Sequence, residues 1–493
     1  MPVDQSVGAD AALTAEPVLL DDRQMREFVT RGYLTFRLDM PEAFHRRVRE
    51  RALEDIGRCE AAGIRSPLNN ALPRIPELRR VFDHPRVAGA LTSILGASYY
   101  LHLHRHMHDN RPGSDAQTIH QDSLGNSRYA VDGNRRHHHC RWAMAFYYPQ
   151  DTTLDMGPSA VAPGSQYLTE GAGLDAEQAL EGPAGTVTIV HYDLFHRGLA
   201  NRSADTRLMI KFLFARMEEP VRPSWNAAQT AWPEDPGSDA RDRQRVWRHH
   251  WRWFRGESAA NGDGAATAAD VRALERDLDH ADEWRGLAAA YGLGAAGAAG
   301  APALMAALTG SDPVARRRAA YGFGPLGRAG VGGLTEAAGH DEAEVRARAV
   351  DVLGDAGRAA GGAVPALGAR LRDESSDVRA LAADALGIAG QGSTAAGEAA
   401  AGRAAGELTT AMEDADAVVR RNAALSVARL GPAAAGAVPA LERALDEEDH
   451  YVRGYAVQAL RRIATPRATA ALLHHLETAR WDPRQDALGA GAA

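Results

Sequence analysis

Residues 118–123 read Thr-Ile-His-Gln-Asp-Ser, and the N-terminal half of the chain is organised around this stretch. His120 and Asp122 are two positions apart, and residues at this spacing on a β-strand point to the same face. We therefore predict a strand that aims one imidazole and one carboxylate at a common point. The pair by itself is weak evidence for a metal site, because His-x-Asp occurs often by chance.

A second histidine on a later strand would complete a metal site. Residues 188–198 read Thr-Ile-Val-His-Tyr-Asp-Leu-Phe-His-Arg-Gly, and we expect His196 to join the pair. Two histidines and one carboxylate on one face are the ligands of non-haem Fe(II) oxygenases, which leave coordination positions open. The sequence therefore predicts His120, Asp122 and His196 as metal ligands and catalytic centre. The alternative is that they are three structural residues in an unrelated β-protein.

An arginine follows His196 on the next predicted strand. Residues 201–205 are rich in turn formers and residues 206–214 read as a strand, so a hairpin would bring Arg207 back beside His196. A guanidinium fixed near the metal suits a two-pronged grip on a carboxylate. Iron together with an arginine-held dicarboxylate is the arrangement of 2-oxoglutarate-dependent oxygenases.

With these residues the sequence resembles the phytanoyl-CoA dioxygenase family over about residues 18–217. The matching positions are His120 to Asp122, a Pro-Gly-Ser turn at 163–165, His196, Arg207, and a helix and strand within 19–34. The resemblance implies a double-stranded β-helix, or jelly-roll, domain that uses Fe(II) and 2-oxoglutarate to oxidise an aliphatic C–H bond of a small molecule, for which a secondary metabolite is one candidate. Hydroxylation, desaturation, epoxidation and cyclisation differ only in how the substrate lies, so the sequence does not choose among them.

The resemblance also implies which residues hold the cosubstrate. Arg207 would bind the distal carboxylate of 2-oxoglutarate. Gln117 stands at an offset from His120 that often contacts the cosubstrate in relatives, although strict strand alternation would turn it to the opposite side. Trp142 matches a position that lines the cofactor pocket, and a core aromatic residue would look the same in the sequence.

Histidine alternates with other residues over positions 99–108, so His102, His104, His106 and His108 would line one face of a strand. A second metal site is disfavoured, because residues in a line on one strand do not converge on one ion. We predict that His104 and His106 line the substrate pocket, with structural or surface roles as the alternative. The basic run 135–139 either lines the mouth of the site and attracts an anionic substrate, or is a solvated loop.

The C-terminal part is repetitive. Residues 289–294 (Ala-Ala-Tyr-Gly-Leu-Gly) recur almost unchanged at 319–324, and Val-Arg pairs recur at 345, 378, 419 and 452. This pattern resembles HEAT repeats, about six of them over residues 282–478, and such helix pairs bury their apolar faces only against their neighbours. The repeats predict an all-α solenoid that positions the substrate, binds a protein partner or mediates self-association.

The predicted fold class is multidomain α+β, a jelly-roll oxygenase domain followed by a HEAT-repeat solenoid. The predicted divisions are a disordered N-terminus at 1–17, the jelly roll at 18–217, a Trp-rich connecting segment and linker at 218–281, the solenoid at 282–478 and a disordered tail at 479–493. The tryptophans of the connecting segment would pack between the domains or cover the substrate mouth. We expect the two halves to fold independently, so that a fragment ending near Phe254 keeps its iron.

Composition narrows the remaining function classes. A net charge of −8 argues against nucleic-acid binding, which needs a basic face. Two cysteines in 493 residues fit a reducing cytosol, so we expect a cytoplasmic protein. We find no signal peptide, and no apolar run that looks long enough to span a membrane. Lys211 is the one lysine, which we attribute to a GC-rich genome. The alternatives to a small-molecule oxygenase are a protein or peptide hydroxylase that uses the solenoid for recognition, and an inactive interaction scaffold.

Overall fold

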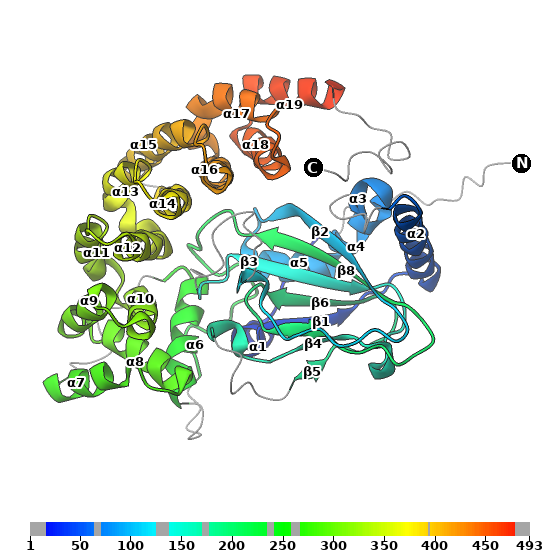
Figure 1. The fold of residues 1–493 in the computed structure, drawn as a ribbon, viewed down its shortest axis with the longest axis horizontal. Coiled ribbons are helices and arrows are strands. Elements are labelled where there is room, and N and C mark those ends of the chain that lie inside the picture. The colour runs from blue at the N-terminus through cyan, green and yellow to red at the C-terminus, as the bar shows by residue number, and fades with distance from the viewer. Residues whose placement is uncertain are drawn as a thin grey trace, which may run out of the picture.

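The computed structural model describes residues 16–63, 71–124, 138–169, 177–233, 241–257, 267–392 and 395–478. A β-sheet domain comes first, and an arc of paired helices then curves around one side of it (Figure 1). The predictions of disorder at both chain ends fall almost wholly outside the described residues. So does the basic run as far as residue 137.

Two antiparallel sheets form the N-terminal domain. The larger sheet has the strand order β1-β6-β3-β8-β2, and the smaller has the order β5-β4-β7. The strands of the larger sheet are β1 (Tyr33–Arg37), β2 (Tyr100–Asn110), β3 (Trp142–Tyr148), β6 (Thr186–His191) and β8 (Arg207–Ala215). Those of the smaller are β4 (Ser159–Val161), β5 (Gln178–Ala179) and β7 (His196–Gly198). This arrangement confirms the predicted jelly-roll domain.

Strand β8 shows which face of the large sheet is the interior of the domain. Met209 and Leu213 belong to the cluster that fills the space between the sheets, whereas Ile210 and Phe212 pack outward against helices. Successive side chains on a strand alternate between faces, so Arg207 and Lys211 share the inner face with Met209 and Leu213.

Short helices cover the outer face of the large sheet. They are α1 (Asp22–Arg31), α2 (Glu42–Ala61), α3 (Ala71–Arg74), η3 (Pro76–Leu78), α4 (Arg79–Phe82) and α5 (Pro85–Leu95). Helix α1 begins with a capping box, in which Asp21 accepts from the Gln24 backbone and the Gln24 side chain bonds back to Asp21. The Phe82 ring of α4 lies 4.0 Å from that of Phe212. The helices thereby leave the inner face of the sheet for the site.

The Trp-rich segment joins the two halves. Its helices are α6 (Arg241–Phe254) and α7 (Ala268–Asp277), and α6 contacts both α1 and the first solenoid helix, α8. The buried Trp251 ring lies 5.2 Å from that of Trp225 and 5.7 Å from that of Trp232. These contacts fit packing between the domains better than a cover over the substrate mouth.

The solenoid contains six helix pairs within the described residues 283–478, as the repeats predict. The pairs are α8 (Glu283–Ala295) with α9 (Ala301–Thr309), α10 (Pro313–Leu326) with α11 (Val331–Ala337), α12 (Ala343–Asp355) with α13 (Val364–Arg370), α14 (Ser376–Ala389) with α15 (Ala395–Ala411), α16 (Ala417–Leu430) with α17 (Val438–Ala444), and α18 (His450–Ile463) with α19 (Pro466–Thr478). Aspartates such as Asp312 and Asp449 cap the first helix of several pairs by accepting from two backbone N–H groups.

One stretch of the solenoid has the length and apolar composition of a membrane-spanning helix, which the sequence reading had not noticed. It runs from Ala417 to Ala444, and 72% of its most apolar window is buried. The stretch covers α16 and α17, which pack against neighbouring repeats as core helices do.

The two halves share a buried polar interface, which the expectation of independent folding did not include. The guanidinium of Arg141, the residue before β3, bonds both oxygens of Glu219 at 2.8 and 2.9 Å and reaches Asp355 at the end of α12 at 2.7 Å. Further along the arc, the His102 ring of β2 bonds the Tyr455 hydroxyl of α18 at 2.6 Å. Because a lone buried charge is costly, separating the halves would leave Asp355 without the Arg141 cation, whereas the Arg141–Glu219 pair would remain on the side of the sheet domain.

Candidate metal centre

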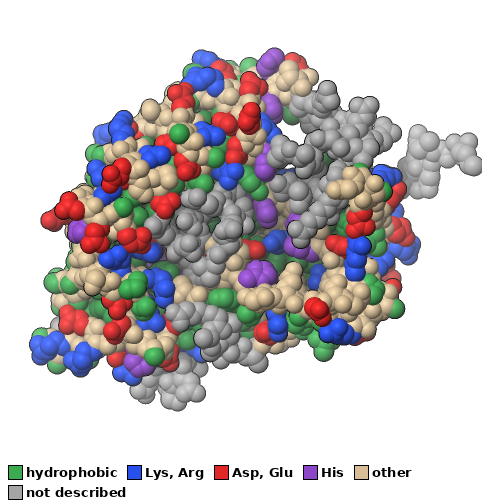
Figure 2. Space-filling view, viewed as in Figure 1, with side chains coloured by type: hydrophobic (Ala, Val, Ile, Leu, Met, Phe, Trp, Pro, Cys, Tyr) green, Lys and Arg blue, Asp and Glu red, His purple; other side chains and the backbone are tan. Residues whose placement is uncertain are grey.

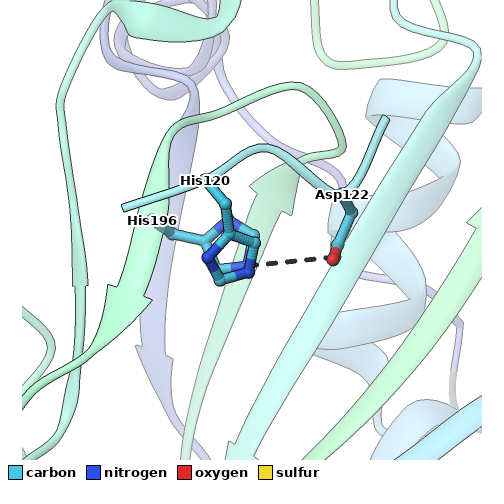
Figure 3. A group of neighbouring side chains, drawn as sticks. All are labelled: His120, Asp122 and His196. Atoms are coloured by element: carbon cyan, nitrogen blue, oxygen red, sulfur yellow. Dashed lines mark ion pairs between the residues drawn. The ribbon is translucent and has the colours of Figure 1, made fainter. Parts of the chain in front are cut away.

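The three predicted ligands converge in the interior of the sheet domain. His120, Asp122 and His196 each offer a ligand atom, and these atoms all lie within 4.8 Å of one another (Figure 3). The His196 Nε2 atom is 3.8 Å from Asp122 Oδ2, and the two imidazole rings are 4.6 Å apart with an interplanar angle of 50°. The structure therefore brings together the residues that the sequence predicts.

The local structure that brings them together differs from the prediction in one respect. The backbones of His120 and His196 exchange two hydrogen bonds of 2.9 Å, which form an isolated antiparallel bridge beside β7. After that bridge the chain turns into η4 (Asp122–Leu124), a 3-10 helix. A continuous strand over 118–122 was therefore a wrong prediction, and it is the turn after His120 that carries the Asp122 carboxylate to the imidazoles.

Backbone carbonyls fix the orientation of both imidazoles. The Nδ1 atom of His120 lies 2.9 Å from the Thr118 carbonyl oxygen, and that of His196 lies 3.0 Å from the Leu194 carbonyl oxygen. Because a carbonyl only accepts, each Nδ1 carries the proton and each Nε2 presents a lone pair. This second hydrogen bond is the usual support of a metal-binding histidine.

The electrostatics keep these donors ready for a cation. Burial lowers the pKa of His196 to about 4, so its imidazole is neutral at physiological pH. Burial alone would raise the pKa of Asp122, but the Lys211 ammonium and the two imidazoles hold it well below its usual range. Two imidazole nitrogens, one carboxylate and no further protein ligand among the described residues fit Fe(II) with open positions.

Arg207 lies buried on the inner face of β8, beside the smaller sheet. Its Nε and Nη2 atoms both donate to the Gly157 carbonyl, at 3.0 and 2.9 Å. Gln117 accepts from the Gly198 N–H at 2.9 Å, and a Cβ on Gly198 would lie 3.2 Å from Gln117 Oε1 and 3.5 Å from Arg207 Nη2. Gln117 and Arg207 thus both lie beside Gly198, two residues beyond His196.

Trp142 is placed where it cannot share a cosubstrate with Arg207. In the register of β3 with β8, Trp142 faces Ala215, whereas Phe146 faces Lys211. Ala215 and Arg207 stand at opposite ends of β8, about 26 Å apart at 3.3 Å per residue. The Trp142 ring contacts His102 and Tyr192 instead. The prediction that Trp142 lines the cosubstrate pocket is therefore wrong, because the strand register places this residue at the other end of the sheet.

Phe146 is the aromatic residue beside the metal centre, and the sequence reading missed it. Its ring centroid lies 5.6 Å from that of His196, and its side chain is fully buried. The alternation of β3 gives the signal that could have found it, because Met144, Phe146 and Tyr148 all belong to the interior cluster. A phenyl ring against His196 excludes water from that side of the site.

The histidine row of β2 runs from the metal centre to the solenoid. His106 faces Lys211 across the β2–β8 pair, and its ring lies 4.2 Å from that of His108. The His104 Nδ1 atom is 3.2 Å from the Tyr451 hydroxyl of α18. Histidine side chains appear in the hollow between the solenoid and the sheet domain (Figure 2). Both positions thus border the interior of the domain, and His104 is shared with the solenoid contact.

His138 and His139 form part of the joint between the halves, so they do not line the mouth of the site. The His138 ring stacks on Tyr321 at 3.5 Å, and His139 bonds Asp355 at 2.8 Å and stacks on Trp253 at 4.5 Å. A cleft of about 940 Å³ lies at this joint, lined by α6 and by loops of the solenoid, and no metal ligand borders it. The cleft belongs to the interface and is separate from the metal centre.

Lys211 is the second residue of the site that the sequence reading missed. Its Nζ atom donates to Asp122 Oδ2 at 2.9 Å, and its side chain is 10% exposed. The signal was available, since Lys211 is the one lysine of the chain.

Comparison with known proteins matches each half of the chain to the family that its sequence resembles. The family model of phytanoyl-CoA dioxygenase (PhyH) matches residues 33–209, and the model of HEAT repeats matches residues 331–404 and 405–491. No curated protein matches the chain.

Several solved structures resemble the sheet domain. One is the non-heme alpha ketoglutarate dependent carbocyclase SnoK from nogalamycin biosynthesis, with 18% identity over 41% of this chain and 88% of that chain, and a TM-score of 0.32. Another is EctD from S. alaskensis with bound Fe, with 17% identity over 45% of this chain and 84% of that chain, and a TM-score of 0.34. The family assignment rests on the matched family models and the donor set. Residues 33–209 are therefore an Fe(II)- and 2-oxoglutarate-dependent oxygenase domain of the phytanoyl-CoA dioxygenase family, which this chain joins to C-terminal HEAT repeats.

Proposed function

We propose that this oxygenase oxidises an aliphatic C–H bond of a small molecule, with His120, Asp122 and His196 as its iron ligands. The observation that carries the proposal is the hydrogen-bonded fixation of both imidazoles, which leaves two Nε2 lone pairs and one carboxylate facing each other. Asp122 fills the third protein position, so the remaining positions are left to the cosubstrate and oxygen. When bound, Fe(II) would activate O₂, which is the oxidant, and the conversion of 2-oxoglutarate to succinate and CO₂ would supply two of the electrons that O₂ takes up.

The residues of the chain bind and orient the reactants. Arg207 grips the distal carboxylate of 2-oxoglutarate, and Gln117 holds the Gly198 backbone beside it. Phe146 keeps water from the buried side of His196. The substrate enters at the other end of the interior, where His104 and His106 stand on β2.

The way in which the solenoid contacts the sheet domain favours a small molecule, and not a protein, as the substrate. Contacts from Asp355, Gln391, Tyr455 and Arg462 to the sheet domain are spread along the arc, so its inner side already faces the chain's own oxygenase domain. A groove for an outside peptide would compete with these contacts. We infer that the HEAT half acts chiefly as a wall of the substrate end, with Tyr451 bonded to His104.

Cosubstrate turnover provides the test. Purified protein with Fe(II), oxygen and 2-oxoglutarate should release succinate, faster when a metabolite extract supplies the substrate and not when a digest of cellular proteins does. His196→Ala should abolish the release, whereas His474→Ala, a change at an exposed histidine of α19, should leave it unchanged. Wild-type protein that binds Fe(II) no better than His196→Ala would favour the inactive scaffold. Stimulation by the peptide digest alone would favour the protein hydroxylase.

A further inference from the structure

Lys211 is an exception within the composition of this chain. The sequence holds 56 Lys and Arg residues, and Lys211 is the single lysine among them. Arginine is used at every other position of this kind in the chain, and Lys211 alone is a lysine. A compact ammonium on a flexible stem differs from a planar guanidinium, because it is a small cation that can move between partners.

The Lys211 side chain lies within the metal centre. Lys211 is 8% exposed, and its Nζ atom donates to Asp122 Oδ2 at 2.9 Å. The same oxygen is the one that lies 3.8 Å from the His196 Nε2 atom. Ammonium and imidazole therefore converge on the carboxylate oxygen that a metal shared with His196 would approach. In the metal-free protein the ammonium supplies the positive charge that Asp122 needs.

Hydrogen-bonding groups that an anion could use lie next to this ammonium. Among the described residues Nζ donates one hydrogen bond, so donors remain for a ligand. His106 faces Lys211 across the strand pair, and His108 lies against His106. The Nε2 atom of His108 is buried and has no hydrogen-bond partner among the described residues. Such an atom is unusual in a folded interior, where buried polar groups are nearly always paired.

Charge balance connects these observations. The Lys211–Asp122 pair is neutral, and a divalent metal adds two positive charges to a buried site. Buried charges are tolerated only when compensated. An anionic ligand that carries a carboxylate next to the metal would restore the balance and would give Lys211 a new partner.

We propose that Lys211 makes metal binding and anion binding depend on each other: its ammonium competes with the metal for Asp122 in the empty site, and pairs with a carboxylate of the bound ligand once the metal is present. The inference rests on the proposed metal centre and adds a positioning residue to it. Lys211 thereby lowers the affinity for the metal when no carboxylate ligand is present, and raises it when that ligand is bound. By thermodynamic linkage, the metal must strengthen anion binding by the same factor.

Calorimetric titration with Zn(II), with and without N-oxalylglycine as a carboxylate probe, tests the proposal without turnover. Lys211→Met should bind Zn(II) at least about tenfold more tightly than wild type when the probe is absent. Because the probe can itself coordinate the metal, it should tighten Zn(II) binding in both proteins, and the tightening should be at least about tenfold larger in wild type than in Lys211→Met. Met209→Leu, a change on the same face of β8, should match wild type in both measurements.

A measurement on the unaltered protein guards against a variant that misfolds. Because the chain has one lysine, ¹³Cε-lysine labelling gives a single side-chain NMR signal. This signal should shift when Zn(II) is added and shift again when N-oxalylglycine follows. A signal that moves with neither addition overturns the proposal, and so does a folded Lys211→Met with unchanged or weaker Zn(II) affinity. If wild type binds no more Zn(II) than His196→Ala, the metal centre itself fails, and the two failures are thereby told apart.

Discussion

At the scale of single residues, the side chains of this site each have a second partner that fixes their orientation. His120 and His196 use backbone carbonyls, Asp122 uses Lys211, and Arg207 uses the Gly157 carbonyl. These partners cost little because most are backbone groups that the fold already places there. They leave the functional atoms facing the interior before any ligand arrives, which is the condition for tight and selective binding.

Arg207 should matter for the cosubstrate and not for the metal. Arg207→Ala should weaken 2-oxoglutarate binding by at least about tenfold, because charge-assisted hydrogen bonds are worth about 1.5–3 kcal/mol each and about 1.4 kcal/mol is one decade. Arg207→Lys should recover only part of this loss, since one ammonium does not reproduce the guanidinium fork. Anaerobic titration of the Fe(II)–2-oxoglutarate absorption band measures the affinity. An unchanged affinity in Arg207→Ala would remove it from the cosubstrate site.

At the scale of elements, helix α18 approaches strand β2 unusually closely. A Cβ on Gly454 would lie 1.9 Å from the Leu103 Cδ1 atom and 2.7 Å from its Cγ. Gly454→Ala should therefore destabilise the protein by about 1–3 kcal/mol, the usual cost of overpacking. Gly406→Ala is the matched control, because Gly406 is also inside a helix but has nothing within 4 Å of its Cβ position.

Urea unfolding measures both variants. The control should be neutral or more stable by up to about 1 kcal/mol, since alanine is the better helix former. Equal stability of Gly454→Ala and Gly406→Ala would show that α18 does not press on β2. The expected difference has a functional meaning, because β2 carries the histidine row beside the metal centre.

Strand β3 should depend on the solenoid through Arg141. Burial would lower the pKa of this guanidinium, but Glu219 and Asp355 raise it, and Arg141 in turn holds the pKa of buried Glu219 at about 2. Arg141→Met should destabilise the protein by about 3–5 kcal/mol, because it leaves two carboxylates without their cation. The exposed Arg443–Glu413 pair supplies the control, and Arg443→Met should change stability by less than about 1 kcal/mol. Similar losses from both variants would contradict the buried network.

At the scale of the whole molecule, the two halves should unfold together. The interface contains the Arg141 network and the His102–Tyr455 contact, which lie on different parts of the arc. Scanning calorimetry of the full chain should show one transition whose calorimetric and van't Hoff enthalpies agree. Two separate transitions would restore the independent halves that the repeat pattern suggests.

Stability should fall with acidity over a defined range. Burial lowers the pKa of His196 and His104 to about 4 and that of His249 to about 3. Between the unfolded value near 6.5 and these folded values, only the unfolded chain takes up the protons, so stability decreases as pH falls. Each group contributes up to about 1.4 kcal/mol per pH unit in that range. Above pH 7 these histidines are neutral in both states and contribute no change.

Thermal unfolding of the metal-free protein at pH 8, 7, 6 and 5 measures this dependence. The midpoint should be constant from pH 8 to 7 and should decrease progressively at pH 6 and 5. His249→Gln should lessen the decrease, because it removes one buried imidazole from the joint between the halves. A midpoint that stays constant down to pH 5 would mean that these imidazoles are not buried in the neutral form.

The sequence by itself determined the two architectures and the metal ligands. Ligand chemistry depends on residue type and order, so His120, Asp122 and His196 were recognisable from their pattern, and the repeats predicted six helix pairs because each pair buries the same apolar positions. The expected hairpin between His196 and Arg207 was a wrong prediction, because β7 pairs with β4 in the smaller sheet whereas β8 pairs with β2 and β3 in the larger sheet. Arg207 comes near Gly198 because the two sheets face each other.

Only the tertiary structure decided what surrounds those ligands. Strand register separates Trp142 from Arg207 and puts Phe146 beside His196, and register depends on pairing between distant segments. The contact of Lys211 with Asp122 likewise joins residues 89 positions apart, and no local pattern encodes it. The docking of the solenoid is of the same kind: each repeat carries the signal for its neighbour, whereas the buried Arg141–Asp355 pair exists only when the two halves are packed together.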